Sequence, residues 1–165
     1  MKSKATKYKQ RIINIWNEVA PFYHNRWAKN EIGPFSVTNS LIKSARIKSG
    51  YTVLDLACGT GLVTKKILTR VGRGQVYGVD SSKSALDIAR KWVGKKQNIH
   101  FILGDAETIQ FDTKFDTITC QYALFFFPNA QKVLKNMKKF LKKNGIIVMS
   151  VHGKFNVPYF DSILK

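Results

Sequence analysis

Residues 51–61 read YTVLDLACGTG, and this stretch decides the fold. The apolar, β-branched run at 52–57 predicts a buried strand. Gly59 and Gly61 follow, and two glycines at this spacing allow a tight turn and a close approach of the backbone to a ligand. The spacing of apolar residues at 61–71 then predicts a helix whose first amides face that turn. The stretch therefore predicts a strand, a glycine loop and a helix arranged around a bound molecule.

The same alternation continues toward the C-terminus. Further strands are predicted at 74–79, 99–103, 115–120 and 146–151, and further helices at 82–93 and 130–142. Asn144 and Gly145 are expected to cap the last of these helices. Strands that alternate with helices form right-handed βαβ units, which build a parallel sheet covered on both faces. We therefore predict an α/β fold with a doubly wound, mainly parallel sheet that binds its ligand at the carboxyl ends of the strands.

Two helices are predicted before the first strand. One covers residues 7–20 and ends at Pro21, and the other covers residues 36–47. We therefore divide the chain into a helical N-terminal cap segment, an α/β core that binds the ligand and a short C-terminal tail, at residues 1–50, 51–153 and 154–165.

Acidic residues stand at the ends of the first three predicted strands. A carboxylate at Asp55 would repel a pyrophosphate and stabilise a sulfonium or an ammonium group. Asp80 can accept hydrogen bonds from both hydroxyls of a ribose, and Asp105 can accept one from an adenine amino group. Alternatively, Asp80 caps the next helix, a role that Ser81 or Ser82 could fill equally well, and Asp105 is a turn residue. The signs of the charges favour S-adenosylmethionine over NAD, although Asp80 suits both cofactors.

Four segments in this order resemble the successive motifs of class I S-adenosylmethionine-dependent methyltransferases: VLDLACGTG at 53–61, VYGVDSS at 76–82, GDAE at 104–107 and FDTITCQYALFFFP at 115–128. Within that class the chain is most similar to the small-molecule group that includes the ubiquinone and menaquinone biosynthesis C-methyltransferases. WNEVAPFY at 16–23 extends the resemblance upstream, so that it covers about residues 16–151. The resemblance implies a Rossmann-like sheet, S-adenosylmethionine as the cofactor and S-adenosylhomocysteine as its product.

The resemblance also implies which residues hold the cofactor. The glycine loop would line its methionine part, Asp80 would hold the ribose, and Asp105 with the Ala106 amide would read the adenine. Gln121 would lie near the methyl-transfer position, and Tyr23 would close over the cofactor's carboxylate end. The full set of cofactor-binding candidates is Tyr23, Asp55, Cys58, Gly59, Gly61, Asp80, Ser81, Asp105, Ala106 and Gln121.

The sequence assigns no catalytic residue. Methyl transfer is an in-line displacement, and it needs a base only when the acceptor must lose a proton. The candidates for such a base are His152, after the fifth strand, and His24, where the resembling group has an acidic residue. Tyr122 and the three phenylalanines at 125–127 favour a small apolar or aromatic acceptor, such as a quinone precursor or a lipid, unless they pack in the core. No metal site is expected.

The resembling group closes its sheet with two further strands after the fifth, and this chain has no predicted equivalents. The fifth strand is therefore expected to be an exposed apolar edge. A truncated chain, a partner that covers the edge, a homodimer formed through it and a minimal variant of the fold all remain open.

Composition bounds the remaining possibilities. The formal net charge of +18 indicates nonspecific binding of polyanions at low salt. No apolar run approaches the length of a membrane span and no signal peptide is recognisable, so we expect a cytoplasmic protein. Two functions compete with methyl transfer. One is a non-catalytic module of the same fold that binds S-adenosylmethionine or a polyanion, and the other is an NAD(P)-dependent oxidoreductase.

Overall fold

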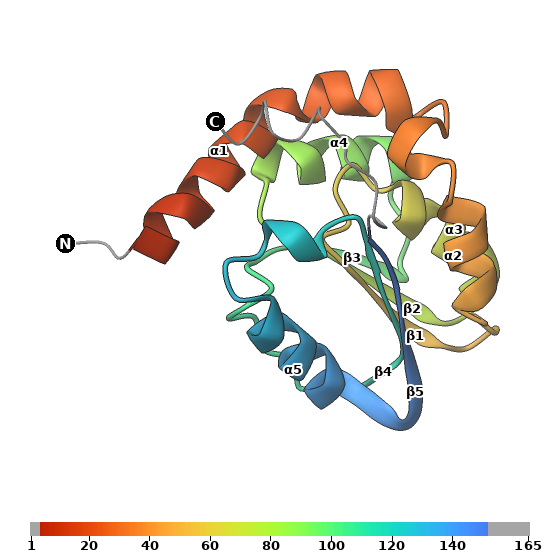
Figure 1. Ribbon diagram of the computed structural model, residues 1–165. Coiled ribbons are helices and arrows are strands. Elements are labelled where there is room, and N and C mark those ends of the chain that lie inside the picture. The colour runs from red at the N-terminus through yellow and green to blue at the C-terminus, as the bar shows by residue number, and fades with distance from the viewer. Residues whose placement is uncertain (1–3, 152–165) are drawn as a thin grey trace.

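The computed structural model describes residues 4–151, so His152 and the predicted C-terminal tail lie outside the described residues. These residues build a five-stranded sheet in which every pairing is parallel, in the order β3-β2-β1-β4-β5. The predicted doubly wound sheet is therefore confirmed (Figure 1). The strands are β1 (Thr52–Leu56), β2 (Gln75–Asp80), β3 (Ile99–Leu103), β4 (Phe115–Gln121) and β5 (Leu141–Ser150).

Helices cover both faces of this sheet (Figure 1). On one face, α2 (Thr38–Ser44) and α3 (Leu62–Val71) pack in a hydrophobic cluster with Val53 of β1. On the other face, α5 (Ala130–Phe140) packs in a second cluster with Leu54 of β1. Because successive strand residues point to opposite faces, both clusters are built from the same buried strands.

The N-terminal helix α1 (Lys4–Tyr23) lies across the carboxyl ends of the strands and against α4 (Lys83–Val93) (Figure 1). Asn17 fixes it there, because its Oδ1 accepts hydrogen bonds from Ser82 Oγ at 2.9 Å and from the Ser84 amide at 3.2 Å. A helix laid over this edge of the sheet forms the roof of any site at the strand ends.

The predicted end of the first helix at Pro21 is wrong. The helix runs through Pro21 to Tyr23 and continues as the π-helix η1 (His24–Ala28). Proline removes one backbone hydrogen bond from the helix, but Ala20 and His24 on either side of it are buried. Tertiary packing therefore outweighs the local preference.

The second predicted helix is shorter than expected. The 3-10 helix η2 (Gly33–Phe35) precedes it, and α2 itself ends at Ser44. Arg46 adopts a left-handed φ of 46°, which an α-helix cannot continue through.

The predicted cap at Asn144 and Gly145 is also wrong, because both residues lie inside β5. The register of β5 against β4 shifts there: Leu141 pairs with Phe115, whereas Ile146 pairs with Thr117. A Cβ on Gly145 would lie 2.9 Å from the carbonyl oxygen of Phe115. The glycine therefore serves a close approach of two strands in an irregular pairing, not a helix end.

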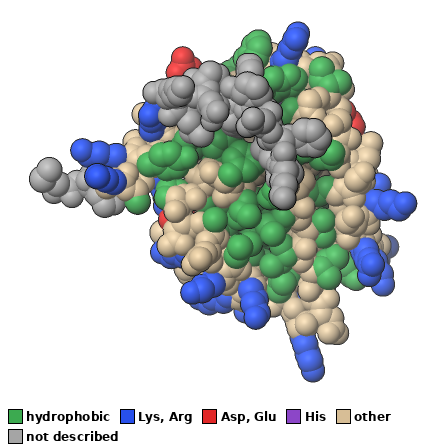
Figure 2. Space-filling view, viewed as in Figure 1, with side chains coloured by type: hydrophobic (Ala, Val, Ile, Leu, Met, Phe, Trp, Pro, Cys, Tyr) green, Lys and Arg blue, Asp and Glu red, His purple; other side chains and the backbone are tan. Residues whose placement is uncertain are grey.

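β5 forms one edge of the sheet and, within the described range, pairs only with β4, as the sequence predicts. Figure 2 shows hydrophobic side chains gathered over the middle of one face of the molecule, with Lys and Arg side chains around them. Met149 and Val151 are among the large hydrophobic residues that are exposed. The helices within residues 4–151 include none with both the length and the hydrophobicity of a membrane span.

Candidate functional site

A pocket opens at the carboxyl ends of β1 to β4, beneath α1. Two of the strands end in left-handed backbone, with φ of 57° at Ala57 and 50° at Tyr122, so the chain turns sharply away from the sheet there. Of the predicted cofactor-binding residues, all except Gly61 line the pocket. Gly61 instead stands at the start of α3 with a φ of 91°. The structure therefore brings together residues that are up to 98 positions apart in the sequence, and they are Tyr23, Asp55, Cys58, Gly59, Asp80, Ser81, Asp105, Ala106 and Gln121.

Asp80 connects two backbone segments of the pocket floor. One carboxylate oxygen accepts from the Gly59 amide at 2.8 Å and the other accepts from the Ser82 amide at 2.8 Å. Burial raises the pKa of Asp80, and these backbone donors act in the opposite direction. Ser82 caps α4 by accepting from the Ala85 amide. Ser82 is therefore the helix cap and Asp80 is not, and the Asp80 carboxylate lines the pocket as a hydrogen-bond acceptor.

Asp55 is buried at the pocket wall, with only 1% of its surface exposed. Its carboxylate accepts hydrogen bonds from Thr64 Oγ1 at 2.5 Å and from Thr119 Oγ1 at 2.8 Å. Burial raises the pKa of Asp55 to about 6, although both hydroxyl donors lower it. A buried carboxylate with a raised pKa gains most from a cationic ligand, which stabilises its ionised form.

The raised pKa of Asp55 predicts that cationic ligands bind more weakly in acid. Above about pH 6 the side chain is ionised, and below it the neutral acid gives up its attraction for a sulfonium or ammonium. We expect the affinity for S-adenosylmethionine to fall about tenfold between pH 7 and pH 5. Isothermal titration calorimetry across this range measures the effect. Asp55→Asn should bind weakly with a flat profile, and an unchanged slope in that variant would assign the titration to another group.

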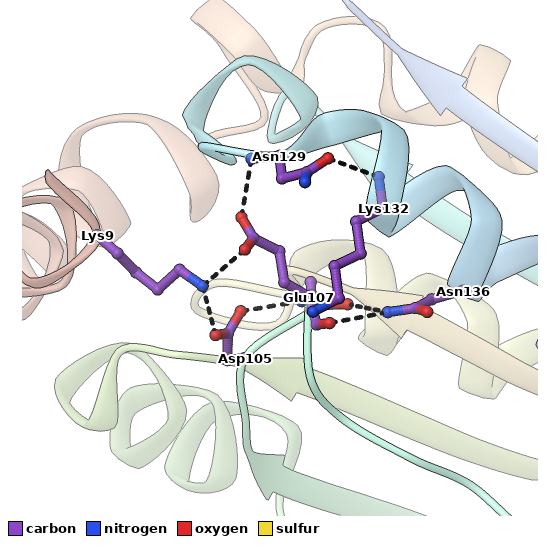
Figure 3. Close-up of polar contacts among 7 residues, drawn as sticks. Lys9, Asp105, Glu107, Asn129, Lys132 and Asn136 are labelled. Atoms are coloured by element: carbon purple, nitrogen blue, oxygen red, sulfur yellow. Dashed lines mark hydrogen bonds and ion pairs between the residues drawn. The ribbon is translucent and has the colours of Figure 1, made fainter. Parts of the chain in front are cut away.

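The third acidic position lies in a cluster shared with α1 (Figure 3). Lys9 Nζ lies 2.6 Å from Asp105 Oδ2 and 2.9 Å from Glu107 Oε2. The other oxygen of Asp105 accepts from the Glu107 amide, which is the turn role that the sequence gives as the alternative for Asp105. Glu107 Oε1 accepts from the Asn129 amide, and Glu107 as a whole is 8% exposed. The adenine end of the predicted site is therefore an acidic turn that a lysine from the roof contacts.

An aromatic wall forms the opposite side of the pocket. Trp16 packs edge-on against Tyr23 at 5.0 Å and against Phe126 of the 3-10 helix η3 (Leu124–Phe126) at 5.5 Å between ring centroids. Tyr23 also meets Phe35 at 5.3 Å. Burial and the neighbouring Tyr122 raise the pKa of Tyr23, so its phenol stays protonated. The wall thus offers apolar ring surface and one neutral hydroxyl.

Gln121 stands at the end of β4 and lines the pocket. Its Nε2 donates to the Pro34 carbonyl at 3.1 Å and to Thr38 Oγ1 at 3.0 Å. Its Oε1 is buried and has no hydrogen-bond partner within residues 4–151. A buried acceptor of this kind is suited to a donor on a bound ligand.

His24 does not line the pocket, although it is close to the glycine loop. Its Nδ1 lies 3.0 Å from Thr60 Oγ1, and its ring packs edge-on against Trp92. Burial lowers the pKa of His24, and the positive charges of Lys29 and Lys65 lower it further. The geometry therefore suits a neutral imidazole that holds Thr60 in the loop more than a base that contacts a substrate.

Sequence reasoning missed several residues of the site. Thr64 and Thr119 hold Asp55, but they stand in a helix and a strand where nothing in the local pattern marks them. Lys9 was one of many lysines, and only the packing of α1 reveals its role. Trp16 lies in the helix predicted at residues 7–20, and the structure shows that Trp16 lines the pocket together with Ile12, Ile13 and Ala20.

Comparison with known sequences relates this chain to methyltransferases. Residues 47–158 match the methyltransferase domain family. Demethylmenaquinone methyltransferase from Staphylococcus haemolyticus is 32% identical over 127 residues, which are 76% of this chain and 53% of that protein. The protein of the same name from Staphylococcus epidermidis is 30% identical over 156 residues, which are 93% of this chain and 61% of that protein. The chain thus spans between half and two thirds of the length of these relatives.

Solved structures share the fold. The YcgJ protein from Bacillus subtilis superposes with a TM-score of 0.64 at 28% identity, over 78% of this chain and 56% of that one. The plantazolicin methyltransferase BpumL, solved with a desmethyl analogue and SAH, has a TM-score of 0.68 at 18% identity, over 93% of this chain and 62% of that one.

Proposed function

Because this chain belongs to the class I family of S-adenosylmethionine-dependent methyltransferases, we propose that it binds S-adenosylmethionine in the pocket beneath α1 and transfers the methyl group to a small apolar acceptor. The observation that carries this proposal is the placement of Asp55, Asp80 and Asp105 around one pocket, next to a glycine loop. Three carboxylates suit a cation with many hydrogen-bond donors, and they oppose the diphosphate of NAD.

The residues of the pocket fit this cofactor part by part. The two oxygens of Asp80 would accept from the ribose hydroxyls, and Asp105 would accept from the adenine amino group. A Cβ added to Gly59 would meet no atom within 4 Å, so the loop leaves open space on the pocket side. Asp55 would stabilise the positive charge of the methionine part from its buried position.

The chemistry that the cofactor supplies is a methyl group activated by a sulfonium. The chain itself would orient the acceptor and exclude water. Trp16, Tyr23 and Phe126 form an apolar wall that holds an aromatic ring and keeps water out. Gln121 Oε1 would accept from a hydroxyl or ammonium donor and so fix its position. No histidine among residues 4–151 lines the pocket, and His152 lies outside the described residues.

We propose an aromatic acceptor of the quinol type. Two observations support it: the aromatic wall, and the name demethylmenaquinone methyltransferase that several relatives carry. A flat ring that stacks within this wall would bury its apolar surface, which favours such a ligand over a charged one.

Binding and turnover measurements test the proposal in two steps. Calorimetry should show binding of S-adenosylmethionine and S-adenosylhomocysteine, with NAD at least a hundredfold weaker. Transfer of a labelled methyl group should then be detected with quinols and phenols in a panel that also contains lipids and RNA. Binding of NAD in preference to S-adenosylmethionine would refute the cofactor assignment. Binding without transfer to any acceptor would favour a non-catalytic module.

A further inference from the structure

Lys9 reaches the pocket from the roof that α1 forms. The side chain leaves α1 and points to the turn after β3, where its ammonium lies between two carboxylates (Figure 3). Lys9 lines the pocket together with Gly104, Asp105 and Ala106. The contact joins residues 96 and 98 positions apart, so it arises from the tertiary fold and not from local helix pairing.

Hydrogen bonds to backbone amides orient the two carboxylates on the body of the protein. Asp105 is bonded to the Glu107 amide, and Glu107 is bonded to the Asn129 amide. Asn136 Nδ2 donates to the carbonyl oxygens of Ala106 and Glu107, each at 3.1 Å. Two acids so close together need a counter-ion, and Lys9 provides it from a different part of the chain.

The contact is less exposed than an ordinary surface ion pair. The Lys9 side chain is 26% exposed, and those of Asp105 and Glu107 are 29% and 10% exposed. Partial burial reduces screening by water and salt, and one ammonium with two anionic acceptors forms two charge-assisted hydrogen bonds. Hence this contact contributes to the position of the first half of α1.

We propose that Lys9 is a positioning residue for the cofactor: it fastens the first half of α1 over the adenine end of the pocket and at the same time orients Asp105 for the adenine amino group. This inference rests on the proposed function, because it takes the turn after β3 as the adenine subsite. It predicts that the roof must release Asp105 and Glu107 before the cofactor enters or leaves. Lys9 then sets the rates at which the cofactor binds and dissociates.

Amide hydrogen exchange of the free protein tests the fastening without any ligand. Lys9→Met keeps most of the apolar stem and removes the charge. We expect amides in the first half of α1 to exchange about tenfold faster than in the wild type. Lys9→Arg should restore protection, because a guanidinium can also bridge two carboxylates. Lys7→Met is the matched control, since Lys7 is exposed on the same helix and carries the same charge.

Stopped-flow fluorescence then tests the consequence for the cofactor, with Trp16 in the pocket as the reporter. In Lys9→Met we expect association and dissociation of S-adenosylhomocysteine both to accelerate about tenfold, with the dissociation constant changed less than either rate. Unchanged exchange in α1 would overturn the proposal. Faster dissociation alone would also overturn it, because Lys9 would then be only a ligand contact. Failure of the wild type to bind S-adenosylhomocysteine would instead refute the proposed function and leave the exchange result standing.

Discussion

Replacing Asp80 with alanine should weaken the binding of S-adenosylmethionine at least a hundredfold, the largest effect expected from a single change in the pocket. The ribose would lose two hydrogen bonds to a charged acceptor, and such bonds contribute roughly 1.5–3 kcal/mol each. The amides of Gly59 and Ser82 would also lose their acceptor, so the glycine loop would no longer be held in the shape that the ligand needs. Isothermal titration calorimetry measures the affinity, and circular dichroism shows whether the variant is folded.

Two further variants separate ribose binding from loss of charge. Asp112→Ala removes the same charge from an exposed residue outside the pocket and should leave the affinity unchanged. Asp80→Asn keeps one oxygen acceptor and should lie between the wild type and Asp80→Ala. If Asp80→Ala is folded and binds within twofold of the wild type, the ribose lies elsewhere.

A glycine-to-alanine series should separate binding from folding at the loop. Gly59 and Gly61 both have left-handed φ, 55° and 91°, which costs an alanine about 1–2 kcal/mol. A Cβ on Gly59 meets no protein atom within 4 Å, whereas one on Gly61 would lie 3.0 Å from Ala89 Cβ. We expect Gly59→Ala to weaken cofactor binding at least tenfold at a modest cost in stability. Gly61→Ala should lower the free energy of unfolding by about 3 kcal/mol, since strain and overpacking combine.

Gly94→Ala is the control for this series. Gly94 has a φ of 79° and open space around its Cβ position, but it lies at the end of α4 away from the pocket lining. Only the backbone strain should remain, with cofactor affinity unaffected. Chemical denaturation and calorimetry on all three variants give the two quantities. Equal losses of affinity in Gly59→Ala and Gly94→Ala would show that the loop does not face the ligand.

The sequence predicts an element correctly where the periodicity of its apolar residues matches the face that it buries in the fold. β3 begins and ends as expected, and the helix after the glycine loop differs by one residue, because buried strands and amphipathic helices carry their own periodicity. Prediction failed where packing reverses a local preference. Pro21 lies within α1, where the nearby residues Ala20 and His24 are buried. Gly145 lies in β5, where the strand approaches the backbone of β4 closely.

In the candidate site, too, some residues could be predicted from the sequence and others could not. Acids that end strands could be predicted, because the carboxyl ends of parallel strands meet at one edge of a sheet. The partners of these acids could not, since Thr64, Thr119 and Lys9 come from other elements and carry no mark of their own in the sequence. The opposite holds for His24. The sequence marks it as a candidate base, yet its side chain contacts Thr60 of the glycine loop and does not line the pocket.

Two parts of the chain line the pocket. Its floor lies in residues 47–158, which match the family, whereas α1 with Trp16 and Tyr23 precedes that region. Neither hydrophobic cluster that flanks the sheet contains a residue of α1. A substitution on the side of α1 that faces the pocket can therefore change contacts with a bound ligand without opening a cavity beside the sheet, whereas the buried Ile12 and Ala20 tie the same helix to the rest of the fold.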